Sequence, residues 1–588
     1  MTVDPTPIDP TRALAPRFAA ALEAAFGAEY RDTDPLLQWS DRADLQANCS
    51  LGLAKRIGEK NPRAVAERLV AKLDASDIVE RFEIAGPGFI NITIKSEWLA
   101  AQLSERLGDA RMGVAPTAAP ETVVIDYSSP NVAKEMHVGH LRSTVIGDCL
   151  ARLLEWQGHA VHRQNHVGDW GTPFGMLIEH LLDLGETRAI EELGVGELNS
   201  FYRAARVKFE ESDAFKDRAR KRVVALQAGD QETLRLWKIL VDESTAYFDA
   251  VYKKLDVTLK PSHIAGESFY NPWLQSVVDE LEEKKLSELS DGAVCVFPPG
   301  FVSKEKKPLP LIVRKSDDGF GYPATDLAAV RYRTQTLKAT RMLYVVGAPQ
   351  AQHFAMVFAV AKMAGWLAAP ARAEHVGFGS VLGTDKQIYR TRSGETVRLV
   401  DLIDAAYDRS LEIVRENSTH IPEDEQREIA KAVGNAAIKY ADLSSDRVKD
   451  YVFDLDRMVK PVGDTGVYLL YAHARSRSIL RKVEKEHGLK APEAGARLLI
   501  EHASEKRLVL QISKLASVLD EVTTVLAPHK LCGYLFDLSV RFNDFWNQCP
   551  VLQSEGDTRL SRLALVRATA DTLKLGLSLL GISAPDRM

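Results

Sequence analysis

Apolar and polar positions in the first part of the chain follow two different periods. Residues 13–27 and 64–73 have the apolar spacing of amphipathic helices. Residues 79–84 and 89–94 instead alternate apolar and polar side chains on both sides of an Ala-Gly-Pro-Gly turn, which predicts a β-hairpin. We therefore expect an α+β domain over residues 1–113.

A strand–helix–strand unit is predicted directly after this domain. Residues 122–127 (TVVIDY) are a short apolar run, which fits a buried parallel strand. Residues 141–157 have helical spacing and end at Gly158, and residues 160–166 suit a second strand. Such a unit is the nucleus of a doubly wound, Rossmann-like parallel sheet.

The pattern of this sheet continues to about residue 400, with one interruption. Residues 197–255 are helical and highly charged, so we interpret the stretch around 185–315 as an insertion between the two halves of the sheet. Strand patterns return at 341–346 and near 375–378. We expect one catalytic α/β domain over residues 120–400.

The last part of the chain, residues 401–588, reads as almost purely helical. One apolar stripe at helical spacing consists of Leu508, Ile512, Leu515, Leu519 and Val522. The predicted fold class is thus α/β and multidomain: an N-terminal α+β domain, a doubly wound catalytic sheet with an insertion, and a C-terminal α-helical bundle. A length of 588 residues agrees with several domains.

Composition narrows the classes of protein only a little. The five cysteines form no C-x-x-C pair, so a zinc knuckle or a disulfide framework is not expected. No apolar run is long enough to cross a bilayer, and the first ten residues lack a basic and apolar signal pattern. We therefore expect a cytoplasmic protein. A net charge of −6 does not by itself indicate nucleic-acid binding.

The candidate chemistry lies between the first strand and the first helix of the catalytic domain. Residues 128–143 read SSPNVAKEMHVGHLRS. A helix start after a parallel strand offers backbone N–H groups and a positive dipole end, which suit phosphate. His137 and His140, three residues apart, would lie on one side of the first helical turn and could donate hydrogen bonds to phosphate oxygens. Two ordinary histidines at a helix start are the alternative.

This segment resembles the ATP-binding signature of class I aminoacyl-tRNA synthetases, in the form seen in the arginine enzyme. Five further segments resemble that family in the same order along the chain: 165–171, 322–328, 344–354, 468–475 and 579–588. The resemblance therefore covers nearly the whole chain, which makes a chance match improbable.

The resemblance implies that arginine and ATP form arginyl-adenylate and pyrophosphate, after which a ribose hydroxyl of tRNA(Arg) takes the arginyl group. This chemistry depends on alignment and on neutralising phosphate charge, so His137, His140 and Lys134 are the expected catalytic donors. Mg²⁺ would accompany the nucleotide, whereas no zinc and no protein-ligated metal is expected. ATP contacts are expected from His137, Gly139, His140, Lys386, Arg390 and Thr391.

The second ATP loop of the family departs from its usual form here. Ile388 stands where a lysine is usual, before Thr391-Arg392-Ser393-Gly394. Lys134, Lys386 and Arg390 are the candidates for the missing cation. For Lys386 a solvated loop charge is the alternative.

A guanidinium requires acidic partners, because its forked donors pair with carboxylates. The resemblance nominates Asp126 and Asp326, with Tyr322 in support, and Asn131 and Gln350 at the amino-acid end of the substrate. For Asp326, helix capping or turn formation is the alternative.

Three regions are expected to contact tRNA. Phe89 and Asn91 on the N-terminal hairpin resemble the family's contact with the tRNA elbow. Tyr468, Tyr471 and Arg475 form the second region and Met588 at the C-terminal end the third; both resemble the family's anticodon contacts. Aromatic residues beside arginines suit splayed bases, although core packing of Tyr468 or Tyr471 is the alternative.

The leading interpretation is an arginyl-tRNA synthetase with tRNA(Arg), L-arginine and ATP as partners, without a membrane partner, and monomeric as is usual for the family. A synthetase paralogue serving a non-translational pathway is the second. An RNA-binding module with a dead active site is the third. Arginine activation in this family usually requires tRNA, so ATP–pyrophosphate exchange should appear only when tRNA is added. An RNA-binding module with a dead active site would show no exchange, and separating the paralogue also needs a tRNA charging assay.

Overall fold

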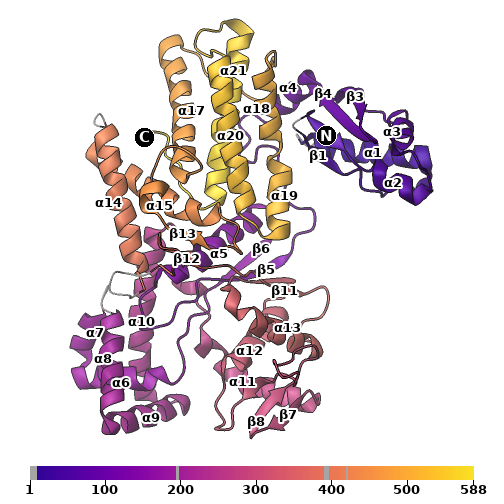
Figure 1. The fold of residues 1–588 in the computed structure, drawn as a ribbon. Coiled ribbons are helices and arrows are strands. Elements are labelled where there is room, and N and C mark those ends of the chain that lie inside the picture. The colour runs from indigo at the N-terminus through magenta and orange to yellow at the C-terminus, as the bar shows by residue number, and fades with distance from the viewer. Residues whose placement is uncertain (1–8, 41, 194–197, 390–395, 419–420) are drawn as a thin grey trace.

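The computed structural model describes residues 9–40, 42–193, 198–389, 396–418 and 421–588 (Figure 1). Around its central parallel sheet, the C-terminal helices lie on one side and the helices of the insertion on the other, while the N-terminal unit stands beside the C-terminal helices. The predicted multidomain α/β class is confirmed.

The N-terminal unit is an antiparallel sheet covered by short helices. Its strands have the order β1-β2-β4-β3, and the predicted hairpin is confirmed as β3 and β4, which pair from Val79↔Ile94 to Ala85↔Phe89. The elements are α1 (Pro10–Phe26), η1 (Ala28–Tyr30), β1 (Leu37–Trp39), β2 (Leu45–Ala47), α2 (Ser50–Ile57), α3 (Pro62–Val70), β3 (Val79–Ala85), β4 (Phe89–Ile94) and α4 (Ser96–Ser104).

The central sheet has four parallel strands in the order β11-β10-β5-β6. They are β5 (Thr122–Asp126), β6 (Ala160–Gln164), β10 (Arg341–Tyr344) and β11 (Arg372–His375). The chain goes from β5 to β6 on one side and later to β10 on the other. Strand order therefore reverses between β5 and β10, the place where open α/β sheets bind ligands. Asp126 lies at that switch point, opposite Tyr344.

Two sequence predictions need correction in this sheet. Helix α5 (Val138–Trp156) begins three residues before the expected Leu141, because His137 itself caps it. The last predicted strand, 375–378, is displaced: β11 ends at His375, and beyond it only an isolated parallel bridge joins Phe378 to Gly347.

The region between β6 and β10 contains the predicted insertion. Five helices come first: α6 (Pro173–Leu184), α7 (Glu186–Leu193), α8 (Leu198–Glu211), α9 (Asp213–Gln227) and α10 (Gln231–Lys254). Then follow η2 (Pro261–His263), η3 (Glu267–Tyr270), α11 (Asn271–Glu283), the antiparallel strands β7 (Ser287–Ser290), β8 (Ala293–Val296) and β9 (Leu311–Arg314), and α12 (Tyr322–Gln335). After β10 come η4 (Ala348–Gln350) and α13 (Ala351–Met363).

Helices dominate the last part of the chain, as predicted, with one small exception. Strand β12 (Val381–Leu382) pairs in parallel with β13 (Tyr451–Val452). The helices are α14 (Leu399–Asn417), α15 (Glu423–Leu443), α16 (Leu455–Met458), α17 (Gly466–His487), α18 (Ala503–Ser513), α19 (Leu515–Val525), α20 (His529–Gln548) and α21 (Gly556–Leu579). The predicted apolar stripe from Leu508 to Val522 is buried but divided between α18 and α19.

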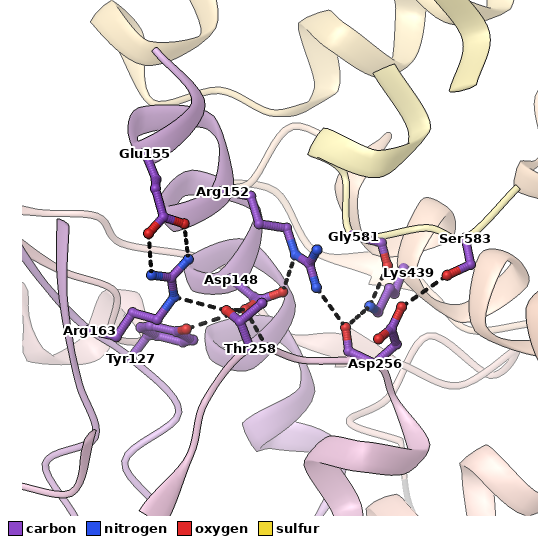
Figure 2. A network of polar contacts seen from close by, with 10 residues as sticks. All are labelled: Tyr127, Asp148, Arg152, Glu155, Arg163, Asp256, Thr258, Lys439, Gly581 and Ser583. Atoms are coloured by element: carbon purple, nitrogen blue, oxygen red, sulfur yellow. Dashed lines mark hydrogen bonds and ion pairs between the residues drawn. The ribbon is translucent and has the colours of Figure 1, made fainter. Parts of the chain in front are cut away.

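Buried charges join α5 to the C-terminal part. Arg142 of α5 pairs with Asp442 of α15 at 3.3 Å, and both side chains are almost fully buried. Lys439, one helical turn before Asp442 on α15, donates to the carbonyls of Asp256 (2.9 Å) and Gly581 (2.5 Å), as Figure 2 shows. Helix α15 therefore connects α5, which starts at the signature histidines, to the segment that follows α21.

Candidate active site

The two signature histidines cap helix α5. Nδ1 of His137 accepts from the backbone N–H of Gly139 at 3.0 Å, and Nδ1 of His140 accepts from that of His137 at 3.1 Å. The ring centroids lie 4.0 Å apart, so both imidazoles stand on the first turn as predicted. Since each Nδ1 is an acceptor, a neutral ring carries its proton on Nε2. The caps thus leave two Nε2–H donors beside the helix start.

The surroundings keep both imidazoles neutral. Burial, reinforced by His137, lowers the pKa of His140 to about 3. Burial and the nearby Lys134 lower the pKa of His137 as well. The two rings therefore act as neutral hydrogen-bond donors at neutral pH, while the positive charge beside them comes from Lys134.

Asp126, nominated for arginine, already has partners within the protein. Arg333 of α12, fully buried, donates from Nη2 to its Oδ2 at 2.7 Å. Ser129 donates from Oγ to its Oδ1 at 3.1 Å. Both carboxylate oxygens are therefore engaged on the floor of the switch point.

Asp326 is better placed to receive a new cation. It lies on α12, four residues after Tyr322, and its Oδ2 pairs with Nε2 of His353 on α13 at 2.6 Å. Gly321, not Asp326, is the N-cap of α12, and Asp326 lies inside the helix, so the alternative of capping or turn formation is wrong. The Asp326 side chain is 16% exposed, so it is accessible but largely shielded from water.

Glu267 is a further acidic residue near Asp326, and sequence reasoning missed it. Burial first, and then the carboxylates of Asp169 and Asp326, raise its pKa to about 8. Glu267 is in turn the main cause of the raised pKa of Tyr322. The charges of Glu267, Asp326 and Tyr322 are therefore close enough to influence one another. The Glu267 segment lies within the stretch interpreted as an insertion, and no local sequence signal distinguishes it.

The loop of Glu267 is held by Asp169 in the Gly168-Asp169-Trp170-Gly171 segment. Its Oδ1 accepts from the backbone N–H of Ser268 at 2.8 Å, and its Oδ2 from the Ser268 hydroxyl at 2.6 Å. Gly266 allows this approach, because a Cβ there would lie 2.5 Å from Oδ2 of Asp169. The conspicuous segment after β6 thus fixes the position of Glu267.

Asn131 and Gln350, the other two predicted arginine contacts, are both exposed. Asn131 lies in the signature loop, bridged to Gly168, and Gln350 precedes the first residue of α13. Both residues follow the carboxyl ends of parallel strands, Asn131 after β5 and Gln350 after β10, and are accessible there.

The second ATP loop is described only in part. Lys386 lies exposed in a tight turn in which Gly383 N–H donates to the Gln387 carbonyl at 2.8 Å. Ile388, at the position of the usual lysine, is 55% exposed. Arg390 and Thr391 lie outside the described residues.

No group of three or more histidine, cysteine, aspartate or glutamate side chains among the described residues could hold a metal ion. None of the described helices is both long and apolar enough to span a bilayer. All five cysteines are free thiols and buried.

Comparison with known proteins gives the family. The catalytic domain model of class I (R) tRNA synthetases matches residues 102–455, the DALR anticodon binding domain matches 469–588, and the arginyl tRNA synthetase N-terminal domain matches 12–94. The arginine–tRNA ligase of Thermobifida fusca is 52% identical over 99% of this chain and 100% of its own length. That of Synechococcus elongatus is 47% identical over 98% and 100%.

The chain belongs to the arginyl-tRNA synthetase family. Solved arginyl-tRNA synthetases have the same fold. The enzyme of Plasmodium falciparum superposes with a TM-score of 0.83 at 28% identity, covering 98% of this chain and 99% of the other. That of Thermus thermophilus gives 0.80 at 25% identity, with coverages of 98% and 100%. The resemblance found in the sequence is confirmed.

The candidate tRNA contacts in the C-terminal part differ in how exposed they are. Tyr471 of α17 is 51% exposed, whereas Tyr468 is partly packed and its hydroxyl accepts from Asn543 at 2.7 Å. Arg475 lies 5.4 Å from the ring of Trp546 on α20. Met588 at the chain end is half-buried.

On the N-terminal hairpin, the other two candidates are half-buried. Phe89 opens β4, and Oδ1 of Asn91 accepts from Gln46 at 2.8 Å. Both residues lie on the outer unit that stands beside the C-terminal helices (Figure 1).

Proposed function

We propose that this protein attaches L-arginine to tRNA(Arg) with ATP, through arginyl-adenylate, releasing AMP and pyrophosphate. The observations that support the proposal are two neutral imidazole donors and a lysine at the start of α5, and the carboxyl groups of Asp326 and Glu267, which influence each other. Helix α5 follows β5, and Asp326 influences Tyr344 at the end of β10, so both groups lie near the place where the strand order reverses. A triphosphate and a guanidinium would be held next to each other there.

Neither chemical step needs a protein nucleophile. The arginine carboxylate attacks the α-phosphorus of ATP, and the pyrophosphate leaves with the electrons of the broken P–O bond. His137, His140 and Lys134 would stabilise the charge on the phosphate oxygens, and Gly139 would leave room for the nucleotide. Lys386, Arg390 and Thr391 are proposed to meet the leaving pyrophosphate. Mg²⁺, bound to the triphosphate, would supply further charge neutralisation.

The guanidinium is proposed to bind between Asp326 and Glu267, with Tyr322 at the rim. Its fixed positive charge favours ionised Glu267, because a cation at hydrogen-bond distance lowers the pKa of a carboxyl. Asp126 would act mainly through its pair with Arg333, which shapes the floor of the pocket. Asn131 and Gln350 would hold the amino-acid end.

Transfer RNA is proposed to bind along one side of the molecule. Residues 1–113 would contact its elbow through Phe89 and Asn91. Residues 401–588 would contact the anticodon through Tyr468, Tyr471, Arg475 and Met588, and residues 120–400, with the insertion around 185–315, would hold the acceptor end. We further propose a cytoplasmic monomer, and light scattering after size exclusion tests its mass.

ATP–pyrophosphate exchange, measured with and without tRNA(Arg), separates the three candidate functions. We expect arginine-dependent exchange only when tRNA is present, followed by formation of arginyl-tRNA. Absence of exchange under both conditions would identify an inactive RNA-binding module. Exchange without charging of tRNA would favour the paralogue that serves another pathway.

A further inference from the structure

Helix α8 of the insertion reaches the signature loop with two side chains on one face. Asn199 and Tyr202, three residues apart, contact Glu135 and Lys134 respectively. The ammonium of Lys134 lies 4.4 Å from the centroid of the Tyr202 ring, within the range of a cation–π interaction. The insertion therefore contacts the candidate catalytic lysine directly.

The contact with Glu135 is reciprocal. Nδ2 of Asn199 donates to Oε2 of Glu135 at 2.6 Å, and the backbone N–H of Glu135 donates to Oδ1 of Asn199 at 3.1 Å. Glu135 is only 4% exposed, so these bonds are sheltered from water. One asparagine thereby fixes both the backbone and the side chain of the residue next to Lys134.

The adjoining face of α8 is anchored in the core of the insertion. Leu198, Phe201 and Ala205 are each at most 1% exposed, and the helix packs against α6 and α9. Asn199 and Tyr202 are thus presented by a fixed helix, rather than by a loop that could follow the lysine.

The signature loop is also held from its other side. Arg398 donates to Oε1 of Glu135 at 3.3 Å. Backbone bonds join Val138 N–H to the Val397 carbonyl at 3.0 Å and Leu399 N–H to the Met136 carbonyl at 2.8 Å. Residues 397–399 directly follow the second ATP loop, so residues 134–138 lie between that segment and α8.

We propose that Tyr202 is a positioning residue for Lys134, assisted by the bond of Asn199 to Glu135, so that the insertion prepares the lysine for the triphosphate of ATP. A lysine side chain has four rotatable bonds, and a ring at 4.4 Å restricts the positions of its ammonium. This inference rests on the proposed role of Lys134 toward ATP.

The test compares Tyr202→Leu with Tyr202→Phe in tRNA-dependent ATP–pyrophosphate exchange. Tyr202→Leu should lower kcat/KM for ATP by roughly 2- to 30-fold, the range of a cation–π contact, and leave KM for arginine unchanged. Tyr202→Phe keeps the ring and should restore the wild-type value. Asn199→Ala should lower kcat/KM for ATP in the same direction, also without affecting KM for arginine.

Phe209→Leu, an aromatic substitution further along α8, is the matched control for damage to the insertion. The inference is overturned if Tyr202→Leu behaves like Phe209→Leu, if it raises kcat/KM for ATP, or if KM for arginine changes equally. Lys134→Met distinguishes a failure of the proposed role of Lys134 from a failure of the role of Tyr202. If it leaves kcat/KM for ATP unchanged, the proposed role of Lys134 fails; if it lowers that value and Tyr202→Leu does not, only the role of Tyr202 fails.

Discussion

At the residue scale, the three candidate arginine-binding carboxylates differ in how far neighbouring groups already compensate their negative charge. Asp126 pairs with the buried guanidinium of Arg333, whereas Asp326 pairs with the imidazole of His353, and Glu267 lies near the acids Asp169 and Asp326. A substrate guanidinium gains most where the negative charge is least compensated. For this reason we propose that Asp326 and Glu267 make the direct contacts with the guanidinium.

Substitution of Asp326 tests that assignment. Asp326→Ala should raise KM for arginine by about 30-fold or more, because loss of one half of a shielded charge pair typically costs about 2–5 kcal/mol. KM for ATP should hardly change, since the triphosphate is proposed to bind at the start of α5, away from Asp326. Steady-state charging kinetics measure both constants, and equal changes in the two would contradict the assignment.

Glu267 gives the pocket a pH dependence. Its pKa is raised to about 8 in the ligand-free protein, so it is largely protonated at pH 7 and must ionise to bind a cation. The affinity for arginine should therefore increase as pH rises from 7 through 8 and then level off. Calorimetric titration at several pH values measures this dependence. In Glu267→Gln this rise in affinity between pH 7 and 8 should disappear. Any pH dependence that comes from the amino group of arginine itself would remain in both proteins.

At the element scale, α5 connects the chemistry to the rest of the fold. It begins at the capping histidines and buries Arg142 one turn later against Asp442 of α15. Burial raises the pKa of Asp442 although Arg142 opposes the rise, so the pair is needed to keep the carboxylate charged in this place.

Removal of one partner of this pair should destabilise the protein strongly. Arg142→Met should lower the free energy of unfolding by about 3–5 kcal/mol, because it leaves a buried carboxylate without its cation. The double variant Arg142→Met/Asp442→Leu should recover much of that loss. Denaturant unfolding of the two variants and the wild type measures the difference; a double variant less stable than the single one would refute the argument.

The elements also mark what the sequence could and could not predict. The hairpin, β5 and β10 followed from local alternation or short apolar runs, and those predictions are confirmed. The predicted start of α5 was three residues too late, because histidine is an unusual helix cap. The stripe from Leu508 to Val522 was predicted as one helix, because its apolar spacing continues across the boundary between α18 and α19. Glu267 and Arg333 could not be found, since their roles come from contacts between segments distant in sequence.

At the scale of the whole molecule, the candidate tRNA contacts lie on two separate parts. The N-terminal unit contacts the C-terminal helices at several places, among them the pair of Lys506 with Asp44 at 2.9 Å and the bond from the Ser104 hydroxyl to the Ala496 carbonyl. Because Phe89 lies on β4 and Tyr471 on α17, we expect their contributions to tRNA binding to be nearly additive.

Phe89→Ala and Tyr471→Ala test this additivity. Each should weaken tRNA binding by about 1–3 kcal/mol, the usual value of a base stacked on an aromatic ring, and the double variant should show the sum. Filter binding or fluorescence anisotropy gives the three dissociation constants, with thermal melting as the control for folding. If Phe89→Ala binds tRNA as tightly as the wild type, the elbow contact is excluded.

The most direct measurement of the central claim is charging of purified tRNA(Arg) with each of the twenty amino acids in turn. A socket of Asp326 and Glu267 beside an ATP cradle at His137 and His140 predicts that arginine alone is esterified to the tRNA, and that ATP is consumed with it. Charging with a neutral or acidic amino acid, or no charging with arginine, would contradict the account.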